Sequence, residues 1–284
     1  MSVRKSDFAG SWYPGSASDC REAIEEFEKD RVPRILPEGA GLGGIVPHAG
    51  WFYSGRIACS VISCLRDDTQ PDTVVVFGRH LHSGSANFIM KEGKWATPLG
   101  ELEIDRELGE TLVSEFPFRV ETASDYEPDN TVEVQLPFIK YFFPEAKILP
   151  LGVPPVAASL KIGERVGELS RARATKTLII GSTDLTHYGY NYGFTPKGVG
   201  KDAVEWVKTQ NDRAVVDLML QMDAGEVIRE SLKNGNACCS GAAATAIAGV
   251  KKMGAKHAHE LVYTTSYDIR PDSSFVGYVG IVFS

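Results

Sequence analysis

The stretch Thr73-Val-Val-Val-Phe77-Gly78-Arg79-His80-Leu81-His82 decides our interpretation of the fold. Its first five residues are all β-branched or aromatic, with no alternation between polar and apolar side chains. Such a run is typical of a strand covered on both faces. Glycine ends the run and two histidines follow. In open α/β sheets ligands bind beyond the carboxyl ends of the strands, so this stretch indicates a strand that leads into a site.

Other parts of the chain repeat this pattern and alternate with helical patterns. Further strands are predicted at Gly43–Val46, Lys147–Val153, Thr177–Ile180 and Phe275–Phe283. Helices are predicted at Asp19 to about Asp30, from Asn130 past Pro137, and at Asp202–Met222, Asp223–Lys233 and Ser240–Met253. Capping boxes are expected at Asp19–Glu22 and Asn130–Glu133. We predict an α/β fold, a single-domain αβα sandwich over residues 1–284 with a central mixed, mostly parallel sheet.

Composition excludes several classes of function. The chain has 284 residues and a formal net charge of -7, and no lysine or arginine cluster is denser than Lys251-Lys252. Nucleic acid and anionic membrane are therefore not expected partners. No apolar run has the length of a signal peptide or membrane span. Five cysteines are an odd number, which favours reduced thiols and a cytoplasmic protein.

Four of the six histidines lie at the ends of predicted strands. His48 follows the strand at Gly43–Val46, and His80 and His82 follow the strand at Thr73–Phe77. Asp184 and His187 follow the strand at Thr177–Ile180. Since parallel strands end at one edge of a sheet, we expect these side chains to form one polar site. His257 and His259 lie in a polar stretch and are expected to be solvated.

Cysteine adds a further group to this site. Cys239 immediately precedes the Ala-rich helix, where free N–H groups and the helix dipole favour a thiolate. Cys238 is interpreted as a packing residue, as are Cys20, Cys59 and Cys64, because most free cysteines behave as small hydrophobic side chains. Two imidazoles with one anionic ligand suit Fe(II), and also zinc or copper.

Several neighbouring residues have alternative interpretations. His187 could act as an acid or base near neutral pH, and Asp184 could orient an imidazole, bind a metal or cap a turn. Arg79 could bind an anion, although a surface salt bridge is the simpler explanation. The aromatic run Trp51-Phe52-Tyr53 could line a pocket or pack in the core.

At these residues the sequence resembles the Memo family, which is named for a mediator of ErbB2-driven cell motility. The resemblance covers nearly the whole chain and depends on the order and spacing of short motifs. These are Ala9-Gly-Ser-Trp-Tyr-Pro14, Pro47-His48-Ala-Gly50, Gly78 with the histidine pair, Glu133-Val-Gln-Leu-Pro137, Ser182-Thr-Asp184-Leu-Thr-His187-Tyr-Gly189, and Cys239 before the small-residue helix.

The resemblance implies a fold similar to that of class III extradiol dioxygenases, which open catechol rings at a non-haem Fe(II). It implies that His48, His82 and Cys239 bind the metal and that His187 is the catalytic acid or base. The implied cofactor is iron or copper, with zinc as a further choice. A thiolate in place of a carboxylate favours Cu(I) or zinc and argues against ring cleavage. His80 stays open as an alternative to His82, and Asn130 and Gln135 stand where some relatives carry histidine.

We therefore expect a metal-dependent oxidoreductase that uses His48, His82 and Cys239, with Asp184 and His187 as catalytic residues. One alternative is a metal-free cysteine hydrolase with Cys239 as nucleophile and His187 as base. Another is a binding module for a peptide or phosphate at a relic site. The expected partner is a small molecule or peptide, and the resemblance also implies a link to radical-SAM and AMMECR-type proteins.

Overall fold

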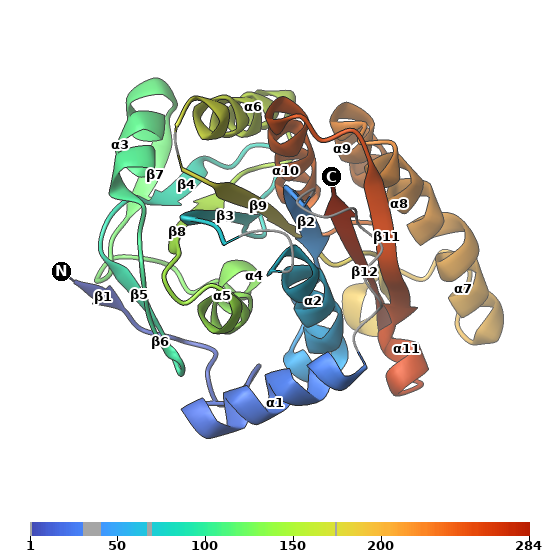
Figure 1. The fold of residues 1–284 in the computed structure, drawn as a ribbon. Coiled ribbons are helices and arrows are strands. Elements are labelled where there is room, and N and C mark those ends of the chain that lie inside the picture. Colours follow the sequence, from blue (N-terminus) through green and yellow to red (C-terminus); the bar gives the residue numbers. More distant parts are fainter. Residues whose placement is uncertain (1, 31–40, 67–69, 174) are drawn as a thin grey trace.

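The computed structural model describes residues 2–30, 41–66, 70–173 and 175–284, and a mixed β-sheet lies at its centre (Figure 1). The strands follow the order β10-β12-β2-β9-β3-β8-β4-β7, and β11 also pairs with β12. Their bounds are β2 Gly43–Val46, β3 Thr73–Gly78, β4 Asn87–Met90, β7 Phe118–Glu121, β8 Lys147–Gly152, β9 Thr177–Ser182, β10 His187–Tyr188, β11 Ala258–Thr265 and β12 Phe275–Phe283. All of the strands predicted from the sequence are confirmed.

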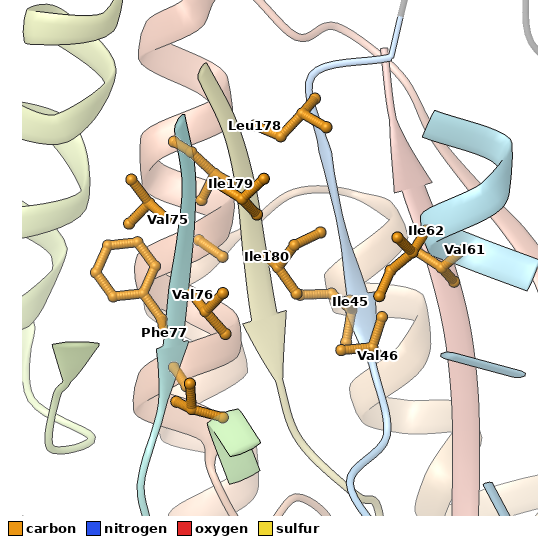
Figure 2. Packing of buried hydrophobic residues seen from close by; sticks show 14 of the residues in the cluster. Ile45, Val46, Val61, Ile62, Val75, Val76, Phe77, Leu178, Ile179 and Ile180 are labelled. Atoms are coloured by element: carbon orange, nitrogen blue, oxygen red, sulfur yellow. The ribbon is translucent and has the colours of Figure 1, made fainter. Parts of the chain in front are cut away.

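The middle of the sheet is parallel. Strands β2, β9, β3 and β8 run in one direction, with Val75 of β3 opposite Ile179 on one side and Leu149 on the other. Apart from the exposed Lys147 at the start of β8, their side chains are buried and pack between the layers, as Figure 2 shows for Ile45, Val76 and Ile180. Because these strands are in register, the segments that follow β2, β3 and β9 leave the sheet at the same edge.

One face of the sheet is covered by α10 (Ser240–Met253), which contacts β9, β3 and β2. Helix α6 (Ala157–Ala172) packs on the outer side of α10. The two helices approach so closely that a Cβ atom on Gly163 would lie 2.0 Å from the carbonyl oxygen of Thr245. Small residues along α10 permit this approach. The predicted buried helix at Ser240–Met253 is confirmed.

The opposite face is covered by α2 (Trp51–Arg66), with α1 (Ala17–Lys29) and α5 (Leu136–Phe142) beside it. The predicted αβα sandwich is therefore confirmed. Cys20, Cys59 and Cys64 are buried on α1 and α2, as expected of packing residues. No helix among the described residues is long and apolar enough to cross a membrane.

Both predicted capping boxes are wrong. The N-cap of α1 is Ser16, whose side chain accepts a hydrogen bond from the Asp19 N–H, so Asp19 lies within the first turn of the helix. Asp129, not Asn130, caps α4 (Asn130–Glu133). A separate helix, α5, then begins at Leu136, because proline is tolerated only in the first turn of a helix.

The C-terminal half follows the sequence more closely. The predicted helix at Asp202–Met222 consists of α7 (Lys201–Trp206), a π-helical turn (Val207–Asn211) and α8 (Asp212–Leu220). Helix α9 (Ala224–Asn234) is capped by Asp223 and ends at Gly235, which is left-handed with φ 62°, as predicted.

The sequence analysis gave no range for α2, α6, β4, β7, β10 or β11. It also missed several further elements, most of which are short. They are β1 (Val3–Arg4), β5 (Lys94–Thr97), β6 (Gly100–Glu103), α3 (Arg106–Glu115), α11 (Ser266–Ile269) and the 3-10 turn Tyr190–Tyr192. Strands β1, β5 and β6 form a second, small sheet.

Candidate metal centre

His48 is held at the end of β2 by contacts to both its backbone and its ring. The His48 N–H donates to Asp184 Oδ1 at 2.7 Å, and Nδ1 lies 3.1 Å from Ser182 Oγ. Both partners belong to β9 or to the loop that follows it, next to β2 in the sheet. A hydrogen bond at one ring nitrogen fixes the orientation of an imidazole and leaves the other nitrogen for a ligand. Here Nε2 is the nitrogen that faces the site.

Asn130 and Gln135 support the same loop from the other side. The Gln135 side-chain amide donates to the Pro47 carbonyl oxygen at 2.8 Å, and that of Asn130 donates to the His48 carbonyl oxygen at 2.9 Å. The resemblance had pointed to these positions only as absent histidines. Their amides hold the backbone of the first histidine, a role that required knowledge of the folded contacts.

His80 enters the site because of the unusual backbone of the residue before it. Arg79 has φ 77°, in the left-handed region that non-glycine residues seldom adopt. Its N–H donates to Thr131 Oγ1 at 2.6 Å, and its guanidinium contacts Glu121 at 2.8 Å and Glu127 at 2.7 Å. Arg79 and Glu121 are both buried, whereas Glu127 is exposed, so one salt bridge lies in the interior and the other reaches the surface. Paired with both carboxylates, Arg79 is not free to bind an anion.

Cys238 and Cys239 come from the segment between α9 and α10. The Cys238 N–H donates to the Asp184 carbonyl oxygen at 3.1 Å, and the Asp184 N–H lies 3.3 Å from Cys238 Sγ. Cys239 is the N-cap of α10, as expected, and its N–H donates to Thr183 Oγ1 at 3.1 Å. The loop after β9 therefore positions both cysteines.

These segments bring four possible metal ligands together. One donor atom from each of His48, His80, Cys238 and Cys239 lies within 4.8 Å of the others. Cys238 Sγ is 3.2 Å from His48 Nε2, and the rings of His48 and His80 are 4.9 Å apart. Imidazole nitrogen and thiolate sulfur are ligands that zinc and copper prefer, so the residues present fit such an ion.

The two cysteines have pKa values that are shifted in opposite directions. Burial disfavours the Cys238 thiolate, but hydrogen bonding from Cys239 and the adjacent His48 outweigh this effect and hold the pKa of Cys238 well below its ordinary value. Burial and the neighbouring Cys238 charge raise the pKa of Cys239. Cys238 is therefore the thiolate of the pair and Cys239 the thiol.

The histidines respond to the same charges. Burial disfavours the charged ring of His48, but Asp184 and Cys238 outweigh it and raise the pKa of His48. Burial likewise opposes charging of His80, and interactions with Asp129 and Cys238 raise its pKa. The Cys238 thiolate and the two imidazoles therefore stabilise one another's charged forms, and metal binding competes with protons for the imidazole nitrogens.

A cavity of about 740 Å³ opens from this group. The residues that line it include His48, His80, Asp184, His187, Tyr192 and Arg270. His187 packs edge-on against Tyr192, with ring centroids 4.9 Å apart. A cavity of this size can hold a small organic molecule next to the histidines.

Comparison with known proteins now identifies the family. The sequence pattern described as Memo-like protein matches residues 4–282. The chain belongs to the Memo family. A MEMO1 family protein of Thermococcus onnurineus is 34% identical over 292 residues, covering 99% of each chain. A MEMO1 family protein of Pyrobaculum aerophilum is 31% identical, covering 100% of this chain and 99% of its own.

The fold has a more distant likeness among solved structures. An uncharacterized protein of Escherichia coli K12, JW3007, superposes with a TM-score of 0.52 over 80% of this chain and 92% of its own. Its sequence identity is 12%, so this likeness concerns the fold alone.

The structure revises which residues of this Memo-family chain come together. His48 and Cys239 lie in the four-residue group, as expected, but His82 does not. His82 is exposed, and its N–H donates to Ser85 Oγ in the following turn. His80 is also exposed, with 47% of its side chain accessible, but its ring lies beside His48. Counting residues from Gly78 could not reveal that the left-handed Arg79 precedes the histidine that joins the group. Cys238, which the sequence suggested as a packing residue, instead lies against His48.

The remaining candidates are distributed as follows. Asp184 and His187 both line the cavity, and Asp184 Oδ2 is 4.0 Å from His48 Nε2. Phe52 and Tyr53 also line it, whereas Trp51 is buried and stacks on Phe138. His257 is exposed, but His259 lies on β11 with its ring 3.2 Å from Ser284 Oγ, so it is only partly solvated.

Proposed function

We propose that this Memo-family chain is a metal-dependent oxidoreductase that acts on a small molecule in the cavity beside His48 and His80. The observation that carries the proposal is the group of two imidazoles and two sulfurs, with donor atoms within 4.8 Å of one another, at the end of a 740 Å³ cavity. When bound, a copper or iron ion supplies an exchangeable electron and an electrophilic centre.

His48, His80 and Cys238 are the proposed ligands. His48 and His80 line the cavity, and the lowered pKa of Cys238 supplies the thiolate that a metal requires. Two histidines and one cysteine are the ligands of copper electron-transfer sites, and three protein ligands leave a position for substrate. Cys239 has a raised pKa and stays a thiol behind this set.

His187 is the proposed group for proton transfer, and Asp184 supports the first metal ligand. His187 lines the cavity, where an imidazole can serve as the general acid or base toward a bound molecule. Asp184 is buried, and its Oδ1 accepts the His48 N–H, so it mainly positions the first ligand. Burial raises the pKa of Asp184, while the charge of His48 acts against that rise.

A cysteine hydrolase is the second candidate, because Cys238 Sγ lies 3.2 Å from His48 Nε2. This is the separation of a nucleophile and its base. The pair is Cys238 with His48, and it replaces the pair of Cys239 with His187 expected from the sequence. In this function, added metal would block the thiolate and inhibit the protein.

Matched variants test the metal site. Untagged protein is purified, and copper, iron and zinc are quantified in the wild type, His80→Ala and His82→Ala, and in Cys238→Ala and Cys239→Ala. We expect near-stoichiometric metal in the wild type, His82→Ala and Cys239→Ala, and its loss in the other two. Reversible reduction of the bound ion by ascorbate, followed by its visible absorption, tests the redox role.

Two results would contradict the proposal. Equal metal content in His80→Ala and His82→Ala would contradict the assignment of His80 as a metal ligand. Stoichiometric zinc with no bound copper or iron would retain the metal site but reject oxidation–reduction. Metal-free protein that hydrolyses ester substrates and is inhibited by added metal would favour the hydrolase.

A further inference from the structure

A second cavity, of about 1090 Å³, lies next to the metal cavity and has a different character. It is bounded by the loop at residues 10–15, by α1 and α2, and by β11. Phe27, Ile57, Val262 and Ile269 are among its lining side chains. No metal-binding group of the described residues lies in this cavity, whose walls are mainly apolar.

The two cavities share part of their rims. Ser11, Trp12, Phe52 and Tyr53 line both of them. Ile269 lines the second cavity and the next residue, Arg270, lines the metal cavity. A molecule that begins at His48 and His80 can therefore extend past the aromatic side chains into the apolar space without leaving the protein surface.

Exposed apolar side chains gather at this junction. Phe52 is 71% exposed, Ile269 42% and Trp12 38%. Such a cluster is unfavourable in water unless a ligand or partner covers it. The charges in the second cavity do not call for a charged ligand, because Arg56 is paired with Asp30 and Asp19 lies at the exposed start of α1.

We infer that the substrate is an amphiphile, with a polar head at the metal site and an uncharged apolar tail in the second cavity. The occupant of the second cavity is the non-reacting part of the substrate itself. Its position follows from the shared rim, and its chemistry follows from the apolar walls and the paired charges. This inference rests on the proposed function for the head, whereas the tail depends only on the second cavity.

A series of n-alkyl hydroxamates with two, six and ten carbons tests the inference. The hydroxamate head binds metal, and the tail varies in length alone. Zinc-loaded protein, whose zinc content is measured first, is titrated with each compound by calorimetry below its micelle concentration. We expect affinity to rise by roughly two- to fourfold for each methylene that enters the cavity.

Variants at the rim locate the tail. Ile269→Glu places a charge in the second cavity and should remove the dependence on tail length, while binding of the two-carbon compound stays unchanged. Ile269→Leu should behave as the wild type. Leu232→Glu is a matched control, because Leu232 is 57% exposed on α9 and lines neither cavity.

The outcomes separate the two proposals. Affinity that does not depend on tail length, or a dependence that persists in Ile269→Glu, overturns the amphiphile inference and leaves the metal site intact. Protein that holds no zinc contradicts the metal site instead. In that case a parallel titration of metal-free protein still tests whether the tail binds in the second cavity, because the effect of tail length on affinity does not require the ion.

Discussion

Cys238 Sγ lies 3.2 Å from His48 Nε2, although 190 residues separate them in the chain. The contact joins the loop after β2 to the segment before α10, two parts that meet only because β2 and β9 are neighbours. The contact lowers the pKa of Cys238 and raises the pKa of His48, because each charged form stabilises the other. The chemistry of the site depends on this pair more than on any other contact.

Selective alkylation of Cys238 is the first prediction. In metal-free protein at pH 6.5, iodoacetamide should modify Cys238 and leave Cys239 unmodified. The pKa of Cys238 is well below its ordinary value, so its thiolate persists at a pH where an ordinary thiol is protonated. Peptide mass spectrometry measures the modification at each cysteine.

Variants and metal provide the controls for this reaction. His48→Ala should slow alkylation of Cys238 at pH 6.5 by about tenfold or more, because it removes one source of thiolate stabilisation. Bound metal should protect Cys238, and urea-unfolded protein should react at all five cysteines. Equal rates at Cys238 and Cys239 in the folded protein would disprove the assigned charge states.

Arg79 is the subject of the second prediction. Arg79→Ala should lower the free energy of unfolding by about 3–5 kcal/mol, because it leaves the buried Glu121 without one of its partners. Arg79→Gly should be less destabilised than Arg79→Ala by about 1 kcal/mol, since glycine adopts φ 77° without strain. Urea unfolding measures both, and a less stable glycine variant would contradict the argument.

The third prediction concerns the buried Glu133, which holds the N-terminal segment. Its carboxylate accepts the Asp7 N–H at 3.0 Å, the Phe8 N–H at 2.7 Å and the Tyr13 hydroxyl at 2.9 Å. Glu133→Leu leaves all three donors without an acceptor and should lower the free energy of unfolding by on the order of 3 kcal/mol or more. Tyr13→Phe removes only one of the bonds and should cost about 1 kcal/mol. Similar losses in both variants would argue against this role.

The fourth prediction is a pH dependence that arises at Asp212. Burial raises the pKa of this carboxyl to about 7, against the effect of hydrogen bonds from Thr186 and Tyr263. The folded protein therefore binds this proton more tightly than the unfolded chain does. As pH rises from about 4 to 7, the unfolded chain loses the proton first, and the free energy of unfolding falls. Above pH 7 the effect is constant.

Asp212→Asn isolates this contribution, because the amide resembles the protonated acid and does not titrate. The stability of the wild type relative to Asp212→Asn should fall by about 1.4 kcal/mol per pH unit within that window. Urea unfolding at pH 4, 5, 6 and 7 gives the slope. A relative stability that is constant, or that rises with pH, would rule out a raised pKa at Asp212.

The sequence alone determined the class of fold and the edge of the sheet at which the site lies. Uninterrupted β-branched runs such as Thr73–Phe77 are local patterns, and burial on both faces follows from them. Parallel strands with histidines at their ends then imply one site. His48 and Cys239 could be placed near this edge from the sequence, because His48 follows its strand directly and Cys239 precedes a helix start that has a local signal.

Only the tertiary structure decided between neighbouring residues. His80 and His82 differ by two positions in a loop, and the left-handed Arg79 selects His80 through contacts with Thr131 and Glu121 from distant segments. Cys238 lies beside His48 because the loop after β9 accepts its backbone N–H. Side-chain direction in a loop is set by such long-range contacts, and a periodic pattern in the sequence carries no record of them.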